Sequence, residues 1–282
     1  MKKQQWLLIS SALLAFILLF TFGITVPPHK QPTATVAANV ASSPSIRFET
    51  LLAKAKEHIS PAQAERLARL ENAVVRGDIK DQQIHVYHQL ARFWSDSARV
   101  FEPYAYYTGE AAKLENSEKS LTFAAHLFLD NLMAETNPAM QNWLATNAKV
   151  LLEKALAINP ANDSSRIGLG ACYMFGNISD NPMQGILPVR EIVAKHPDNL
   201  YGQMILGLGG KKSGQYDKAI ERFKIVVEHQ PDNLEAIFHL AECYDLHGEK
   251  ANAIQWYEVA EKLIRIPEAK AEIDKRILEL KK

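Results

Sequence analysis

The chain has 282 residues, 47% hydrophobic and 9% aromatic, which is enough to bury the core of one large domain or of an array of repeats. Its 32 basic and 32 acidic residues cancel, and the chain after residue 46, which lacks Lys2, Lys3 and Lys30, is slightly acidic. Because no net positive field would attract a polyanion, we expect no nucleic-acid partner.

The amino-terminal segment predicts a membrane anchor. Residues 6–26 carry no charged side chain, and a helix of that length, at about 1.5 Å per residue, spans roughly the 30 Å hydrocarbon layer. Lys2 and Lys3 precede it, so the positive-inside rule predicts that residues 1–5 are a short cytoplasmic end. The bulk of the chain would then be periplasmic. A cleaved signal peptide is the alternative, although its apolar region usually holds about 7–15 residues.

Residues 27–46 follow as a predicted disordered linker. They are rich in Pro, Ser, Thr and Ala and show no apolar period. Residues 47–282 would then form one folded domain of helical repeats.

Apolar residues at helical spacing predict paired helices through the first part of this domain. The first pair includes a capping box formed by Ser60 and Gln63. In a later pair, Asn137 caps a long turn, with Pro138 at the first helical position. The segments expected to be helical are 45–58 with 60–77, 81–100 with 102–116, and 117–135 with 147–160.

An internal repeat is clear from residue 163 onward, in segments 163–199, 200–233 and 234–267. An offset of 34 residues aligns Leu206 with Leu240 and Gly214 with Gly248, and it also aligns large and small apolar residues of the two segments. Small residues suit close helix contacts, and glycine suits the left-handed end of a helix. The first of the three segments carries three additional residues in the turn 176–182.

This pattern resembles the tetratricopeptide repeat, a helical hairpin of 34 residues. The resemblance implies an all-α solenoid of hairpins wound as a right-handed superhelix. Two features depart from the family: no tryptophan opens the hairpins, and the last repeat ends late, at Pro267. The residues that carry the resemblance are Gly170, Tyr173, Gly207, Ala219, Phe223, Pro231, Leu240, Tyr244, Ala253, Tyr257 and Ala260.

The chain closes with a predicted capping helix over residues 268–282. Ile273, Ile277 and Leu280 form one apolar stripe under a charged face, as expected of the last helix of an array.

The resemblance also implies where partners bind. In this family the first helices of successive hairpins line a concave groove for peptides or partner helices. We therefore expect protein or peptide partners and no small-molecule substrate. The groove positions are Ile167, Ala171, Met174 and Phe175, then Tyr201, Met204, Leu208 and Lys211, then Glu235, Phe238, Glu242 and Asp245. This floor is mostly apolar, with one acidic end.

No other chemistry stands out. His85, His88 and His126 lack the further ligands of a defined metal site, and the glycine-rich stretch 206–214 lacks the spacing of a phosphate-binding loop. We expect neither metal nor cofactor. The two cysteines, Cys172 and Cys243, are interpreted as packed thiols.

The aromatic stretch 92–110 allows two interpretations. Its aromatic residues fill an irregular core, which we favour, or they form a ligand platform. The residues concerned are Trp94, Tyr104, Tyr106 and Tyr107.

The sequence thus predicts a membrane-tethered scaffold or adaptor that binds proteins through a groove. A periplasmic holdase-like chaperone associated with secretion or envelope assembly is the alternative. No set of catalytic residues can be assigned, and we expect no enzymatic activity.

Overall fold

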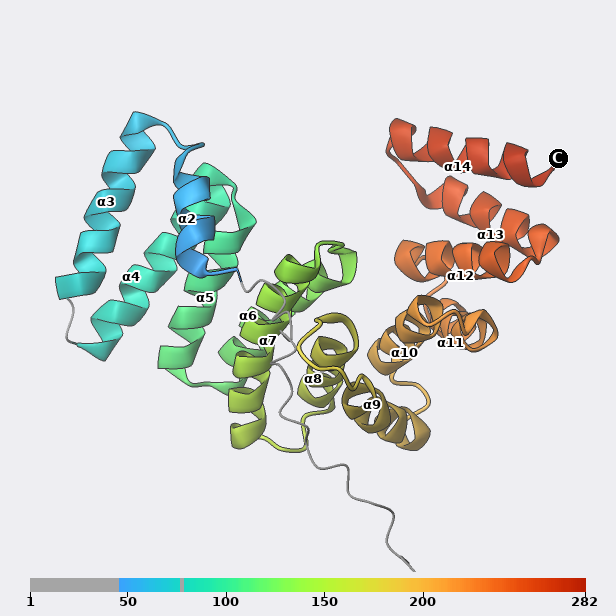
Figure 1. Ribbon diagram of the computed structural model, residues 1–282, viewed down its shortest axis with the longest axis horizontal. Helices are drawn as coiled ribbons and strands as arrows, with labels where there is room; N and C mark the ends of the chain where they lie inside the picture. The colour runs from blue at the N-terminus through green and yellow to red at the C-terminus, as the bar shows by residue number, and fades with distance from the viewer. Residues whose placement is uncertain (1–45, 77–78) are drawn as a thin grey trace, which may run out of the picture. The chain divides into compact units, whose positions relative to one another are not determined.

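The computed structural model describes residues 46–76 and 79–282, and this part of the chain is helical without strands (Figure 1). The predicted anchor at 6–26 and the linker up to residue 45 lie outside the described residues. No helix within the described ranges is long and apolar enough to cross a membrane. The helices are α2 (Phe48–Lys56), α3 (Pro61–Arg76), α4 (Lys80–Arg92), the π-helix η1 (Phe93–Ala98), α5 (Phe101–Glu115), α6 (Glu118–Ala134), α7 (Pro138–Ile158), α8 (Asp163–Phe175), α9 (Met183–Lys195), α10 (Leu200–Lys212), α11 (Tyr216–His229), α12 (Leu234–His247), α13 (Lys250–Leu263) and α14 (Pro267–Leu280).

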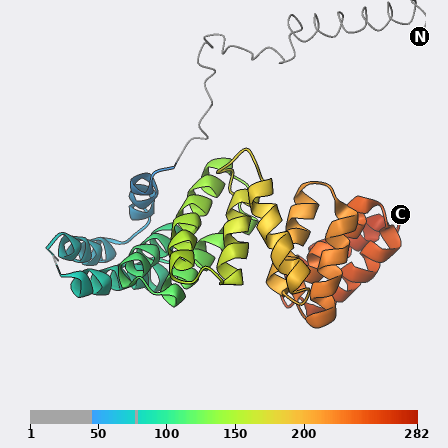
Figure 2. The ribbon, with the colours of Figure 1, turned by 90° about the horizontal axis from the view of Figure 1, so that it is seen from below.

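Successive helices pack as hairpins along the chain. From α4 onward each helix contacts the next, and alternate helices also touch, α6 with α8, α8 with α10 and α10 with α12. Figures 1 and 2 show these hairpins following one another in chain order. The predicted all-α repeat solenoid is therefore confirmed over the described residues, with hairpins α8–α9, α10–α11 and α12–α13 in the three repeat segments.

Side-chain caps fix where the helices begin. The predicted box is present: the backbone N–H of Ser60 donates to Gln63 Oε1 at 2.8 Å, and that of Gln63 donates to Ser60 Oγ at 3.3 Å. Asn162, Asn199 and Asn233 each accept a bond from the backbone N–H three residues later, at 2.8, 2.9 and 3.0 Å. Each first helix of the three repeats thus starts with the same asparagine cap.

The second helix of the third pair is longer than the segment 147–160 that was expected to be helical. It runs unbroken from Pro138 to Ile158, so Pro138 stands at the first helical position, as predicted. Asn137 caps it directly, since its Oδ1 accepts from the N–H groups of Ala139 and Met140. The stretch assigned to a turn contains the buried Trp143, Leu144 and Ala145, so burial of this extra length favours the helix.

Glycines allow the two helices of a hairpin to approach. A Cβ on Gly207 would lie 2.7 Å from the Phe223 ring, so this glycine makes room for a large residue of the second helix, as predicted. Gly214 and Gly248 end α10 and α12 with φ of 74° and 87°, and nothing else crowds them. Their role is therefore conformational.

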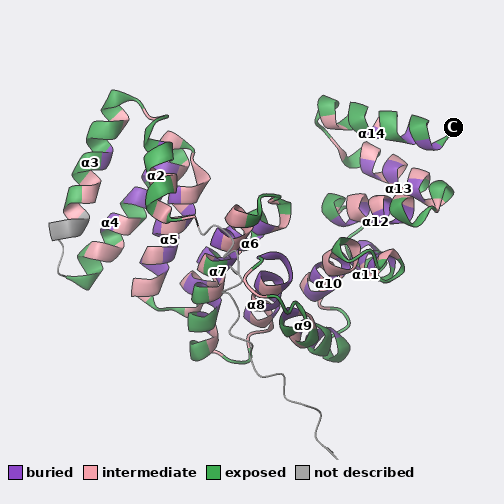
Figure 3. Cartoon of the chain, viewed as in Figure 1, coloured by how far each residue is buried: buried purple, intermediate pink, exposed green. Residues whose placement is uncertain are grey.

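The core forms three clusters along the array, and the purple positions in Figure 3 mark the buried residues. Leu208 of α10 packs against both the central and the carboxy-terminal cluster, which makes α10 the connecting element. The predicted stripe Ile273, Ile277 and Leu280 is buried under α14, as expected of a cap.

Most of the aromatic stretch is core. Trp94 and Tyr107 are buried, and Tyr106 stacks on Phe48 with ring centroids 3.4 Å apart. Trp94 lies in η1, a π-helical turn that the sequence predicted as ordinary helix and that ends at the left-handed Arg99. Tyr104 also packs against the core cluster that contains Trp94 and Tyr107, and in addition it lines a surface cavity with residues of α4, α5 and α6. The core interpretation is confirmed for Trp94, Tyr106 and Tyr107.

Candidate binding surface and cavity

The predicted groove residues of α10 and α12 lie on one side of each helix. Residues Tyr201, Met204, Leu208 and Lys211 of α10, with Glu235, Phe238, Glu242 and Asp245 of α12, are called here the α10–α12 face. Spacings of three and four residues place the members of each set in one row. All are partly or fully exposed, and Met204, Leu208 and Phe238 also rest on the carboxy-terminal core cluster. The face is therefore an apolar surface with polar ends.

The α8 residues of the predicted groove do not belong to this surface. Ile167 and Ala171 are fully buried, and Met174 and Phe175 are 8% and 7% exposed. The hairpin α8–α9 packs more tightly than its repeat position implied, because α8 also contacts α6, α7 and α10. These four side chains belong to the central core cluster and form no part of the α10–α12 face.

Lys211 and Glu242 connect the two helices of the face. The Lys211 ammonium donates to Glu242 and lies 3.2 Å from His239 Nδ1, which in turn lies 3.0 Å from Glu242 Oε2. Burial alone would raise the pKa of Glu242, but the hydrogen bonds from His239 and Lys211 outweigh it and hold that pKa below its ordinary value. Glu242 is thus a fixed, charged part of the face.

Asp245 is neutralised from the capping helix. Arg276 of α14 donates to both of its carboxylate oxygens, at 2.7 and 2.9 Å. Such a two-point pair fixes both side chains. With Glu242 and Asp245 both paired, the acidic end predicted for the groove reduces to the exposed Glu235.

A polar group at the other end of the face was missed by sequence reasoning. His126 of α6 lies 3.1 Å from Ser164 Oγ and packs its ring against Tyr201, with centroids 5.5 Å apart. Burial raises the pKa of Tyr201, so its phenol stays protonated. Ser164 aligns with Tyr201 at the repeat offset of 37 residues, and this alignment was the signal in the sequence that could have pointed to this polar group.

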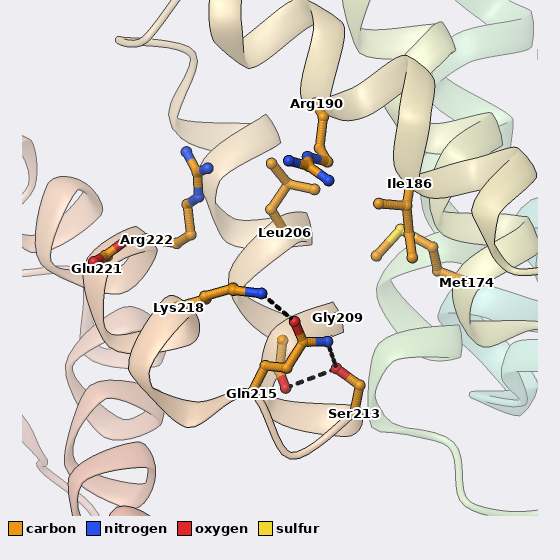
Figure 4. Close-up of a pocket in the computed structure, with 11 residues that line it drawn as sticks. Met174, Ile186, Arg190, Leu206, Gly209, Ser213, Gln215, Lys218, Glu221 and Arg222 are labelled. Carbon is orange, nitrogen blue, oxygen red and sulfur yellow. Dashed lines mark hydrogen bonds between the residues drawn. The ribbon is translucent and has the colours of Figure 1, made fainter.

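A separate cavity of about 340 Å³ opens between the hairpins α8–α9 and α10–α11. Met174, Ile186 and Leu206 form its apolar wall, and Arg190 and Arg222 flank Leu206 (Figure 4). Lys218 donates to Gln215 Oε1 at 2.7 Å at its lower edge. This cavity could not be predicted from sequence patterns, because its lining comes from four helices and a turn.

The histidines and cysteines form no metal centre in the described ranges. His88 pairs with Glu115 at 2.6 Å and His85 bonds to Gln89, so these two histidines lie in separate contacts. Cys172 and Cys243 are buried free thiols, as interpreted from the sequence, and burial raises their pKa to about 12 and about 11.

Comparison with known proteins supports the repeat. The tetratricopeptide repeat family model matches residues 211–267. No curated protein sequence matches the chain.

Several solved structures are similar to the chain. The crystal structure of MamA protein is 17% identical, covers 67% of this chain and 94% of its own, and has a TM-score of 0.42. MamA 41-end from Desulfovibrio magneticus RS-1 is 19% identical over 66% and 96%, also at 0.42. A tetratricopeptide repeat protein from Parabacteroides merdae is 13% identical over 82% and 98%, at 0.44. Residues 211–267 of this chain, which include α11, α12 and α13, are therefore similar to the tetratricopeptide repeat family.

Proposed function

We propose that this protein is a membrane-tethered adaptor that binds an extended peptide or a helix of a partner protein on the α10–α12 face. One observation supports this most: Met204, Leu208 and Phe238 form a partly exposed apolar row on two adjacent helices. Stacked hairpins leave such a row open because each hairpin contacts only its neighbours. An apolar row with polar ends suits a partner that buries apolar side chains and forms hydrogen bonds at its rim.

The charged groups of the face would set the register of a partner. Lys211, His239 and Glu242 form one fixed network, so a bound chain meets oriented donors and acceptors there. At the opposite end Tyr201 is half-buried and packs against the ring of His126. A partner with apolar residues between two polar positions fits this order.

The proposed cellular location rests on the amino-terminal sequence. Residues 6–26 are proposed as a single transmembrane helix with a cytoplasmic amino end, and residues 27–46 as a linker with a mean reach on the order of 25 Å. The repeat domain would then lie in the periplasm, close to the membrane. Protease added outside sealed spheroplasts should degrade the repeat domain, whereas a protected domain would contradict this placement.

The binding proposal is tested by charging the face. The double variant Met204→Glu with Phe238→Glu should lose the proteins that proximity labelling detects around the intact anchored protein. Leu187→Glu on α9, at a position 56% exposed and away from the face, is the matched control and should keep them. Identical partner sets for all three proteins would contradict the proposal, and many unfolded clients in place of a few fixed partners would favour the chaperone alternative.

A further inference from the structure

The cavity between the hairpins α8–α9 and α10–α11 carries an excess of positive charge. Three basic side chains line it, Arg190, Lys218 and Arg222, against one acidic side chain, Glu221. No ion pair joins Glu221 to any of the three in the described part of the chain. Because the chain after residue 46 carries slightly more acidic than basic residues, this local excess of positive charge stands against the average.

Arg222 is held in place by a buried side chain. Its Nη1 donates to Oε1 of Gln203 at 2.9 Å, and the Gln203 amide donates to the backbone carbonyl of Pro197 at 2.7 Å. Gln203 is only 1% exposed, so the guanidinium rests on a fixed support at the cavity wall. A side chain ordered before binding loses less conformational entropy when a ligand arrives.

Arg190 approaches from the other side of Leu206 and has no hydrogen-bond or ion-pair partner among residues 46–76 and 79–282 (Figure 4). Its donors are therefore free for a ligand. Guanidinium groups pair best with planar carboxylates, which accept two parallel bonds.

The other half of the lining is apolar. Met174, Ile186 and Leu206 face the same space. A free inorganic anion in the cavity would lose water molecules on this side and would gain no hydrogen bonds in their place. A carboxylate with an apolar side chain next to it satisfies both halves of the cavity. A volume of about 340 Å³ accommodates a few side chains and not a folded element.

We propose that this cavity is a second binding site, for an acidic side chain flanked by apolar side chains in an extended segment of a partner protein. The carboxylate lies between Arg190 and Arg222, and the apolar side chain packs on Ile186 and Leu206. The site is separate from the α10–α12 face, so either can fail without the other.

Binding is measured by fluorescence anisotropy on the full chain in nonionic detergent. The probe is a labelled, acetylated and amidated peptide Gly-Ser-Leu-Glu-Leu-Glu-Leu-Gly-Ser, with its Glu-to-Gln counterpart as the uncharged probe. We expect the acidic probe to bind and the uncharged probe to bind at least about tenfold more weakly, since the carboxylate pairs would be lost.

The double variant Arg190→Gln with Arg222→Gln should also weaken the acidic probe at least about tenfold. The control Lys195→Gln with Lys224→Gln removes the same charge from the same two helices outside the cavity and should leave affinity within about twofold. Arg190→Gln alone removes no bond within the described residues, so its expected several-fold loss cannot reflect misfolding.

Any one of three results would overturn the assignment. The acidic probe does not bind up to about 1 mM, the two probes bind with equal affinity, or the arginine and lysine double variants weaken binding of the acidic probe equally. Complete displacement of the probe by inorganic phosphate, with phosphate binding as tightly as the probe, would instead assign the cavity to a free anion.

Discussion

Gly170 of α8 and Gly185 of α9 face each other where the two helices of their hairpin cross. A Cβ on Gly185 would lie 2.2 Å from the carbonyl oxygen of Gly170, and a Cβ on Gly170 would lie 2.5 Å from Cγ2 of Val189. These distances are far inside van der Waals contact. The helices can pack this closely only because neither position carries a side chain.

Gly170→Ala should therefore destabilise the protein by about 2–3 kcal/mol, because the methyl group forces α8 and α9 apart. Urea denaturation followed by circular dichroism measures the loss. Gly109→Ala is the matched control: its Cβ would meet Leu151 and Phe128 at 3.6 Å, an ordinary contact, and helix propensity favours alanine by about 0.5–1 kcal/mol. Equal effects of the two substitutions would contradict the packing described for this hairpin.

The asparagine caps of the repeat helices should contribute to the stability of the protein. Asn233→Ala removes the oxygen that accepts from the Ala236 N–H at 3.0 Å, and it should lower the free energy of unfolding by about 1 kcal/mol. Asn233→Ser keeps a capping oxygen and should lose little. The account fails here if alanine and serine at this position give the same denaturation midpoint.

Glu242 predicts a pH dependence of stability. The pKa of Glu242 in the folded chain lies below the ordinary 4.5. Ionised Glu242 therefore contributes to the free energy of unfolding above pH 4.5, and this contribution disappears as the pH falls through the lower pKa of the folded chain. Glu242→Gln should cost about 1 kcal/mol at pH 7, a discounted value because the ion pair is partly exposed. The difference from the unsubstituted protein should narrow below pH 4.5.

The control for this experiment is Glu221→Gln, which removes an exposed carboxylate with no ion pair in the described ranges and should stay within about 0.5 kcal/mol at every pH. Parallel denaturation series at neutral and acid pH compare the three proteins. A gap between Glu242→Gln and the unsubstituted protein that is the same at both pH values would show that the network does not depend on ionised Glu242.

The repeat register offers a further test. Ala219 is fully buried, and a Cβ on Gly210 would already lie 3.3 Å from its methyl group. Ala219→Trp should overpack this crossing and lower both helicity and the melting temperature. Unchanged circular dichroism and melting of this variant would contradict the assigned register.

The fold was predictable from the sequence where repeat and local signals agreed. The spacing of Gly207 and Phe223, or of Ser60 and Gln63, reflects contacts within one hairpin or one helix turn, and the structure confirms both. The Asn137 cap and the Pro138 start of α7 were predicted as well, but the region around the buried Trp143 was read as a turn, so the expected helical segment began only at residue 147.

The candidate site was less predictable, for a physical reason. Repeat position says which side of a helix faces its neighbours, but it does not say how closely those neighbours approach. Ile167 occupies the same repeat position as Met204, yet it is fully buried, and its helix α8 packs against α6, α7 and α10. The pairs Lys211–Glu242 and Asp245–Arg276 join residues of different hairpins, so no local pattern announces them.

The most direct test of the central claim places a photo-crosslinking amino acid at single positions of the full chain in the cells that produce it. At position 204, on the α10–α12 face, we expect irradiation to give one or a few discrete crosslinked partners. At position 187, on the exposed side of α9, the same partners should be absent. Equal crosslinking at both positions, or none at position 204, would contradict partner binding on this face.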